Sequence, residues 1–208
     1  MLKLSFLDKS ILHIDNVLRG FNKTCASPAE HITNQPQLSA DEKRASRSMM
    51  RINHSGEICA QALYHSQALL AKSPTQYATF MQAAEEENAH LSWCKARLTE
   101  LNGRPSILNP VWYAGSFAIG LVAGAAGDQI SLGFLAETEY QVTEHLEKHL
   151  ANLPHADYKS RAVLHQMRQD ELQHATKAKE DGGSVLPAPV KFLMRCTAKV
   201  LTVTARWI

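Results

Sequence analysis

Aromatic residues, glycine and proline are scarce in this chain. Only 7% of its 208 residues are aromatic, and it has 10 glycines and 8 prolines, whereas 45% are hydrophobic. So few helix-breaking residues are typical of a helical protein, and the length suits one domain with a substantial core. We therefore predict an all-α fold.

The sequence also lacks a strong charge and a nucleotide-binding motif. Its formal net charge is +2, which predicts no broad basic face and argues against nucleic acid as a partner. No Gly-x-Gly-x-x-Gly run occurs, and this excludes tight nicotinamide binding by a Rossmann unit. The four cysteines form no Cys-x-x-Cys pair. With no export signal, they are expected to be reduced thiols.

Residues 1–38 are predicted to stand apart from the main domain. Residues 1–20 carry two aspartates and only one arginine, unlike an organelle presequence, and their apolar residues recur at helical spacing. A short amphipathic helix is expected here, followed by a loop rich in Asn, Ser, Thr and Pro. Residues 39–208 are predicted to form the remaining domain.

Capping and stop signals divide most of that domain into long helices. Ser39 and Glu42 form a capping-box pattern, Pro74 suits a first helical position, and Asp128 can cap a third helix. The predicted helices cover residues 39–72, 73–102, 128–152 and 155–181. Short turns after the first and third helices predict two antiparallel hairpins, as in a four-helix bundle.

Two Glu-x-x-His tetrads are the most informative motifs. A spacing of three residues places carboxylate and imidazole on one helical face. Each tetrad follows a glutamate on the preceding helix, and both partners lie at a similar distance from the turn. The candidate metal ligands are Glu57, Glu87, His90, Glu139, Glu171 and His174. This is the ligand pattern of a dinuclear iron or manganese centre in a four-helix bundle.

Four glutamates in a bundle core need compensating positive charge, because desolvating each carboxylate costs several kcal/mol or more. Two divalent cations would balance them. The expected assignment gives Glu57 and His90 to one ion, Glu139 and His174 to the other, and Glu87 and Glu171 as bridges. Oxygen and imidazole ligands without thiolate favour iron or manganese. Asp170 and Glu86 could orient the histidines, or simply face solvent.

Two further segments suggest a membrane surface. Residues 105–127 carry no charged side chain, but a single membrane crossing there would separate the two halves of the candidate site. The segment is therefore expected to return along the bundle or to lie in the lipid interface, covering the open end of the site. Residues 186–208 carry a stripe of Lys191, Arg195 and Lys199 beside apolar residues. They predict an amphipathic helix on anionic lipid, or a terminal helix docked on the core.

The run from Arg51 to Glu57, both tetrads and the crossover beginning near Pro110 resemble the demethoxyubiquinone hydroxylase family of ubiquinone biosynthesis, over roughly residues 40 to 208. The resemblance is to a bacterial member. It implies a ferritin-like di-iron monooxygenase with two iron ions per subunit. Such an enzyme uses dioxygen to hydroxylate a polyprenylated methoxy-methyl-benzoquinol on the cytoplasmic side of the cell membrane. It would be a peripheral protein, as a homo-oligomer or in a biosynthetic complex.

The six candidate ligands all match the metal ligands of that family. One departure concerns the residue after His145, which is a tyrosine in some members and Leu146 here. Electron delivery through that tyrosine is therefore in doubt, and the quinol itself or a separate reductase could supply the electrons.

Other functions remain open at this stage. Any one of the six residues alone would be an ordinary surface acid or a hydrogen-bonded histidine. A ferritin-like protein for iron storage or peroxide scavenging could use the same ligands, although the Cys-x-x-Cys module usual in peroxide-reducing relatives is missing. A non-catalytic lipid-binding subunit and a hydroxylase of modified tRNA are two further alternatives.

Overall fold

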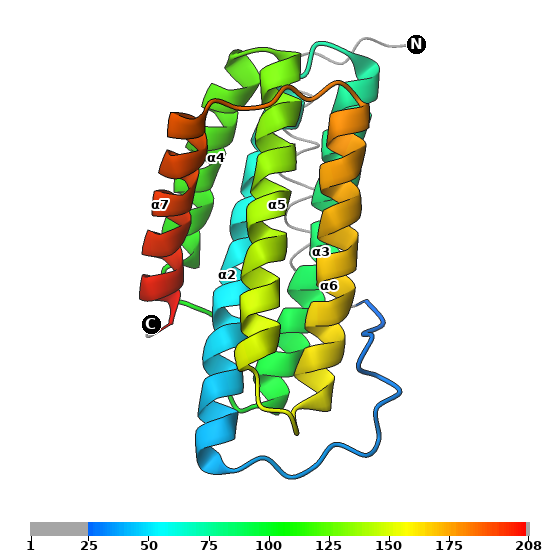
Figure 1. Cartoon of the computed structure of the whole chain (residues 1–208), viewed down its shortest axis with the longest axis vertical. Coiled ribbons are helices and arrows are strands. Elements are labelled where there is room, and N and C mark those ends of the chain that lie inside the picture. Colours follow the sequence, from blue (N-terminus) through cyan, green and yellow to red (C-terminus); the bar gives the residue numbers. More distant parts are fainter. Residues whose placement is uncertain (1–24, 207–208) are drawn as a thin grey trace.

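The computed structural model describes residues 25–206, and this part of the chain is helical, without strands (Figure 1). Its helices are α2 (Ala40–Leu70), α3 (Pro74–Glu100), α4 (Asn109–Ala125), α5 (Asp128–Asn152), α6 (Tyr158–Glu180) and α7 (Ala188–Ala205). The prediction of an all-α fold is confirmed. The helix expected within residues 1–20 lies outside the described residues, as do Trp207 and Ile208.

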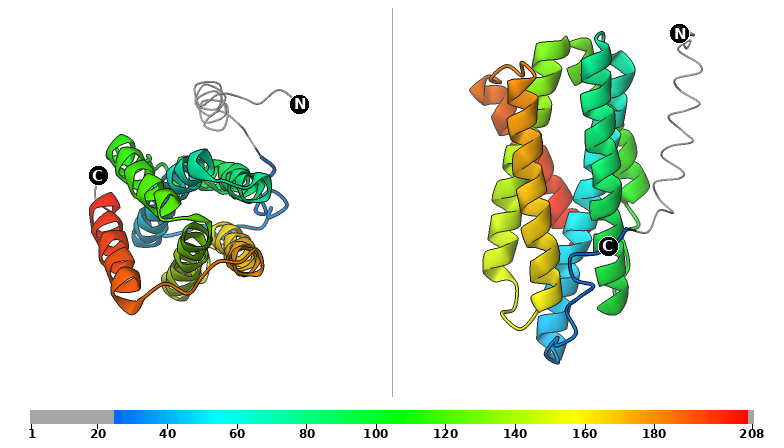
Figure 2. Two further views of the ribbon diagram at one scale, coloured as in Figure 1. Left: turned by 90° about the horizontal axis from the view of Figure 1, so that it is seen from above. Right: turned by 90° about the vertical axis from the view of Figure 1, so that its right-hand side faces the viewer.

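Helices α2, α3, α5 and α6 form the four-helix bundle. Both hairpins, α2–α3 and α5–α6, are antiparallel, and they pack beside each other so that α3 lies next to α6 (Figures 1 and 2). The long connection between the hairpins contains α4, which gives the bundle the arrangement of ferritin-like proteins. The predicted architecture is therefore confirmed.

Local sequence signals explain where most helices begin. The Ser39 hydroxyl accepts a hydrogen bond from the Glu42 amide at 3.2 Å, and the Glu42 carboxylate accepts one from the Ser39 amide at 2.9 Å. This is the predicted capping box. Ser73 caps α3, with Pro74 as the first helical residue. Asn102 adopts a left-handed conformation at φ 56° and ends that helix.

Two predicted helix starts were wrong. Asp128 does not cap α5: Gly127, at φ 102°, is the N-cap residue and Asp128 is already helical. The Asp128 side chain instead accepts a hydrogen bond from the Lys72 amide at 3.4 Å, beyond the end of α2. The fourth helix begins at Tyr158 rather than near residue 155, because Asp157 caps it through the Ser160 amide at 3.0 Å.

Helix α4 returns along the side of the bundle and packs lengthwise on α2 (Figure 1). It does not lie across an end of the bundle. Gly120 permits this close approach, because a Cβ atom there would lie 2.0 Å from Ser66 Oγ and 2.6 Å from the Leu63 carbonyl oxygen. Among the described helices, none is both long enough and apolar enough to cross a membrane.

The core consists of two apolar clusters. The first cluster contains Met50, Cys94, Leu98, Leu146, Leu164 and Met167 among its members. The second cluster contains Tyr64, Phe80, Ala84, Leu132, Leu135 and Ala178 among its members. The candidate ligands lie on the helical turns between these clusters, so the polar site is closed by apolar packing on either side.

Candidate metal centre

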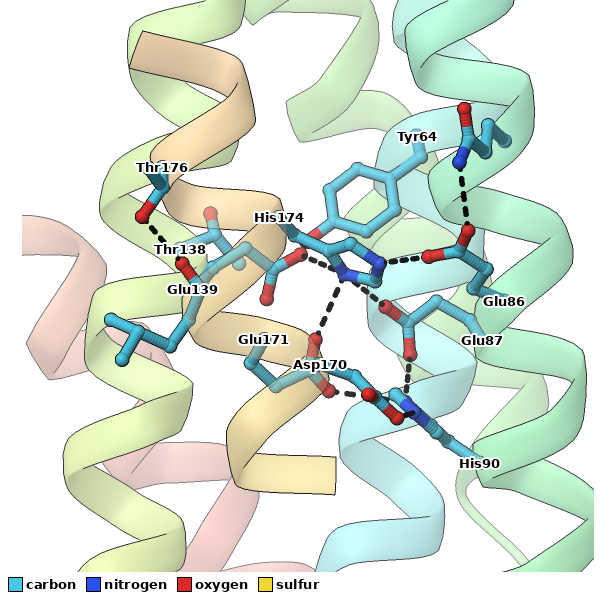
Figure 3. A network of polar contacts seen from close by, with 12 residues as sticks. Tyr64, Glu86, Glu87, His90, Thr138, Glu139, Asp170, Glu171, His174 and Thr176 are labelled. Carbon is cyan, nitrogen blue, oxygen red and sulfur yellow. Dashed lines mark hydrogen bonds and ion pairs between the residues drawn. The ribbon is translucent and has the colours of Figure 1, made fainter. Parts of the chain in front are cut away.

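All six candidate ligands lie close together in the bundle, and Figure 3 shows all of them except Glu57. Helix α2 contributes Glu57, α3 contributes Glu87 and His90, α5 contributes Glu139, and α6 contributes Glu171 and His174. The four glutamates and His90 are buried, with at most 3% of each residue exposed, and His174 is exposed by 10%. The tertiary structure thus brings together every residue that the motifs predicted.

The six side chains form two overlapping groups of potential metal ligands. One group contains Glu57, Glu87, His90 and Glu171, and the other contains Glu87, Glu139, Glu171 and His174. Within each group, one ligand atom per residue lies within 4.8 Å of the others. Glu87 and Glu171 belong to both groups, which is the arrangement that two bridged cations require.

Each imidazole turns one nitrogen toward the carboxylates. His90 Nδ1 lies 3.2 Å from Glu87 Oε2 and 3.1 Å from Glu171 Oε1. His174 Nδ1 lies 3.1 Å from Glu171 Oε2 and 3.8 Å from Glu139 Oε1. The Nδ1 atoms are therefore the nitrogens available to a metal ion.

The outer nitrogen of each imidazole contacts a carboxylate from the opposite hairpin. His90 Nε2 lies 3.1 Å from Asp170 Oδ2, and His174 Nε2 is hydrogen-bonded to Glu86 (Figure 3). Asp170 is in turn held by Gln166 at 2.8 Å. Carboxylates in this position fix the orientation and tautomer of metal-binding histidines. The sequence left two roles open for Asp170 and Glu86, either orienting the histidines or facing solvent. Their contacts with the two imidazoles fit the orienting role.

The pKa values of the clustered side chains are shifted by burial and by their close charged neighbours. Burial, followed by the neighbouring Glu87 and Glu171 carboxylates, raises the pKa of Glu57 well above its usual range. Burial, followed by the Glu171 and Glu87 carboxylates, also raises the pKa of Glu139. Burial alone would lower the pKa of His174, but its contacts with Glu171 and Glu86 raise it to about 11. Protons on these groups offset the repulsion that cations would otherwise relieve.

The donor set fits a pair of divalent cations. Glu87 Oε1 and Glu139 Oε2 are buried without a hydrogen-bond partner in the described structure, so each has an oxygen free to bind a metal ion. Carboxylate and imidazole donors suit iron or manganese, and no thiolate belongs to either group. The nearby Cys94 thiol instead contacts Met167 Sδ at 3.8 Å.

Sequence reasoning missed one residue of the site. Tyr64 is fully buried, and its hydroxyl donates a hydrogen bond to Glu139 Oε1. A signal was present, because Tyr64 follows Glu57 by two helical turns and therefore shares its inward face. The partner of the hydroxyl lies on α5, which only the packing of the two hairpins could identify.

Leu146, which departs from the tyrosine of some relatives, is a core residue of the first cluster. The ring of the adjacent His145 contacts that of His149 at 3.9 Å between centroids, tilted by 59°. His149 Nδ1 lies 2.9 Å from Asn53 Oδ1. These two histidines lie outside both groups of potential metal ligands.

Comparison with known proteins identifies the family. The family profile described as "Ubiquinone biosynthesis protein COQ7" matches residues 44–205. This chain belongs to the COQ7 family. Membership confirms the resemblance predicted from the motifs and the role in ubiquinone biosynthesis.

Curated COQ7 relatives align over nearly the whole chain. A protein from Cupriavidus necator is 52% identical, covering 96% of this chain and 99% of its own length. Proteins from Nitrosospira multiformis and Nitrosomonas europaea are 51% and 50% identical, covering 97% and 95% of this chain and 99% and 100% of their own lengths. All three relatives are named 3-demethoxyubiquinol 3-hydroxylase. This chain is therefore an enzyme, a hydroxylase of ubiquinone biosynthesis.

Proposed function

We propose that this chain is a di-iron monooxygenase that hydroxylates demethoxyubiquinol, a polyprenylated methoxy-methyl-benzoquinol, with dioxygen as co-substrate. The observation that carries the proposal is the buried set of four glutamates and two histidines in two overlapping groups. The names of the COQ7 relatives supply the substrate and the position of the new hydroxyl group.

Each ligand has a distinct role in this proposal. Glu57 and His90 would hold one iron ion, Glu139 and His174 the other, and Glu87 and Glu171 would bridge them. Two ferrous ions, when bound, supply the two electrons that reduce dioxygen for hydroxylation. Asp170 and Glu86 would keep the imidazoles oriented, and the two apolar clusters would exclude water. Manganese has similar ligand preferences and is the alternative metal.

We place this enzyme at the cytoplasmic side of the cell membrane as a peripheral protein. Helices α4 and α7 lie on the same side of the bundle (Figure 2) and expose large apolar side chains. Val111 and Val122 of α4 are 62% and 73% exposed, and Phe192 and Leu193 of α7 are 69% and 65% exposed. Exposed apolar residues of this density favour contact with lipid or with another protein, and a prenylated substrate resides in lipid.

Two cations of the α7 stripe contact the bundle, which favours the docked-helix alternative for this segment over anionic lipid. Lys191 Nζ lies 2.7 Å from Glu137 Oε2, and Arg195 lies 3.8 Å from Glu144, both on α5. These ion pairs dock α7 on the bundle, so the helix turns apolar side chains outward. Membrane binding is therefore expected to depend on apolar insertion more than on anionic lipid.

Vesicle flotation tests the membrane part of the proposal. The protein should float with neutral phosphatidylcholine vesicles, and the double variant Phe192→Ser, Leu193→Ser should lose most of that binding. Leu172→Ser removes a residue that is 44% exposed on α6 and should bind like the wild type. Equal flotation of all three proteins would contradict attachment through α7. A homo-oligomer or a larger biosynthetic complex stays a prediction.

Quinone analysis of cells tests the enzymatic part. Cells that lack this protein should accumulate the demethoxy quinone and lose ubiquinone, as measured by lipid extraction and mass spectrometry. Glu57→Ala or His174→Ala should fail to restore ubiquinone and should abolish metal loading, whereas the exposed Glu180→Ala should restore it. Normal ubiquinone in cells carrying either ligand variant alone would contradict the proposal. A large iron-filled shell in gel filtration would instead favour iron storage.

A further inference from the structure

Tyr64 makes the two oxygens of Glu139 different from each other. Its hydroxyl, fully buried inside the bundle, donates to Glu139 Oε1 (Figure 3). The second oxygen, Oε2, is buried without a hydrogen-bond partner in the described structure. One oxygen of this carboxylate is thus engaged by the protein, and the other is left for a metal ion.

The duplicated hairpin has no equivalent of this contact. Tyr64 follows Glu57 by seven residues, and the residue in the same relation to Glu139 is Leu146. Both side chains are buried, but they belong to different apolar clusters on the two sides of the centre. Leucine has no donor group, so the pseudo-symmetry of the six ligands is broken by a single phenol. The two halves of the site are chemically unequal.

A small hollow lies beside His174 and Glu86, on the outer side of that imidazole. It has a volume of about 30 Å³ and is lined by Ala83, Glu86, Leu135 and His174 among others. Ala83 and Leu135 belong to the same apolar cluster as Tyr64. A cavity of this size has room for a molecule as small as water. Neither Tyr64 nor Glu139 lines it, so any open position beside Glu139 depends on how that carboxylate binds the metal ion.

We propose that Tyr64 is a positioning residue that restricts Glu139 to binding through one oxygen. The metal ion held by Glu139 and His174 would then keep a coordination position open for a small ligand such as dioxygen or azide. This inference rests on the proposed metal centre. The physical reason is that a hydrogen bond to Oε1 competes with its use as a second metal ligand, whereas nothing at Leu146 imposes such a restriction on the other half.

Cobalt(II) binding with azide as the small ligand tests the inference without an activity assay. The visible absorption of bound cobalt(II) weakens as its coordination becomes six-fold, so it reports an open position directly. Wild type and Tyr64→Phe should each bind two cobalt ions per chain. The variant should have weaker visible bands and roughly tenfold or more weaker azide affinity, the size of effect expected when a group orienting a metal ligand is removed.

Tyr77→Phe is the matched control, because Tyr77 packs at the edge of the same apolar cluster and should behave like the wild type. Azide affinity in Tyr64→Phe equal to that of both other proteins would overturn the role of Tyr64. Loss of one cobalt ion from Tyr64→Phe would also overturn it, because the residue would then be needed for binding rather than for positioning. If the wild type bound no cobalt at all, the metal centre itself would be wrong.

Discussion

Asp170 Oδ2 lies 3.1 Å from His90 Nε2, although the two residues belong to opposite hairpins. Asp170 directly precedes the candidate ligand Glu171, and Glu86, which contacts His174, directly precedes the candidate ligand Glu87. The two contacts therefore cross between α3 and α6 in a reciprocal way. Each hairpin supplies the group that orients the histidine of the other.

Replacing Asp170 should weaken the metal centre without unfolding the bundle. In Asp170→Asn the charged partner of His90 is lost, and we expect metal affinity to fall about 10- to 100-fold. Competition between the protein and a coloured chelator for cobalt(II) measures this change. The exposed Asp41→Asn should leave the affinity unaltered, and an equal affinity in both variants would contradict the orienting role of Asp170.

Acid should destabilise the metal-free protein through His54. Burial, followed by the charge of Lys95, lowers the pKa of His54 from 6.5 to about 4. Between these values the unfolded chain binds a proton that the folded chain does not, so stability falls as the pH falls. Between pH 6.5 and pH 5, His54 alone should reduce the free energy of unfolding by about 1.5 kcal/mol.

Urea unfolding at pH 6.5 and pH 5, in the presence of chelator, measures the contribution of His54. His54→Gln should lose about 1.5 kcal/mol less than the wild type over this interval. The exposed His155→Gln serves as the control, since removing a solvent-facing histidine should leave the acid sensitivity in place. The role of His54 would be refuted if all three proteins lost the same stability.

The contact of α4 with α2 should depend on Gly120. Gly120→Ala places a methyl group against Ser66 and the Leu63 backbone, and we expect a loss of about 1 to 3 kcal/mol. Gly115→Ala is the matched control on the same helix, because a Cβ atom there meets nothing within 4 Å. It should stabilise the protein by roughly 0.5 to 1 kcal/mol. Chemical denaturation measures both changes in the free energy of unfolding. Opposite signs for the two variants would support the close packing, and no change in Gly120→Ala would contradict it.

A buried ion pair at the other end of the bundle should be sensitive to the loss of one partner. Arg97 Nη2 lies 2.7 Å from Asp157 Oδ1, and the Asp157 residue is fully buried. Arg97→Met leaves that carboxylate without its charge partner and should cost about 3 to 5 kcal/mol. Arg44 pairs with Asp41 at the surface, and Arg44→Met should change stability by less than about 1 kcal/mol. Similar thermal unfolding of both variants would argue against the importance of the buried pair.

Much of the site could be read from the sequence because its ligands repeat at fixed helical intervals. Glu87 with His90, and Glu171 with His174, share a helical face whatever the surroundings. The positions of the turns near Ser73 and Pro154 indicated how far along the bundle these residues lie. The role of Asp128 could not be predicted in this way, because its carboxylate accepts a hydrogen bond from the Lys72 amide, which is distant in sequence.

Spacing along the chain determined most of the helices and the six inward-facing candidate ligands, because helical periodicity is a local property. The motifs themselves carried the resemblance to the family that the profile match shows. Only the tertiary structure decided how the hairpins meet. It determined that Asp170 reaches His90, that Tyr64 reaches Glu139, and that Lys191 turns toward α5 and leaves the apolar side chains of α7 exposed. Each of these contacts joins residues distant in sequence, so each depends on the packing of side chains between helices and not on any one helix.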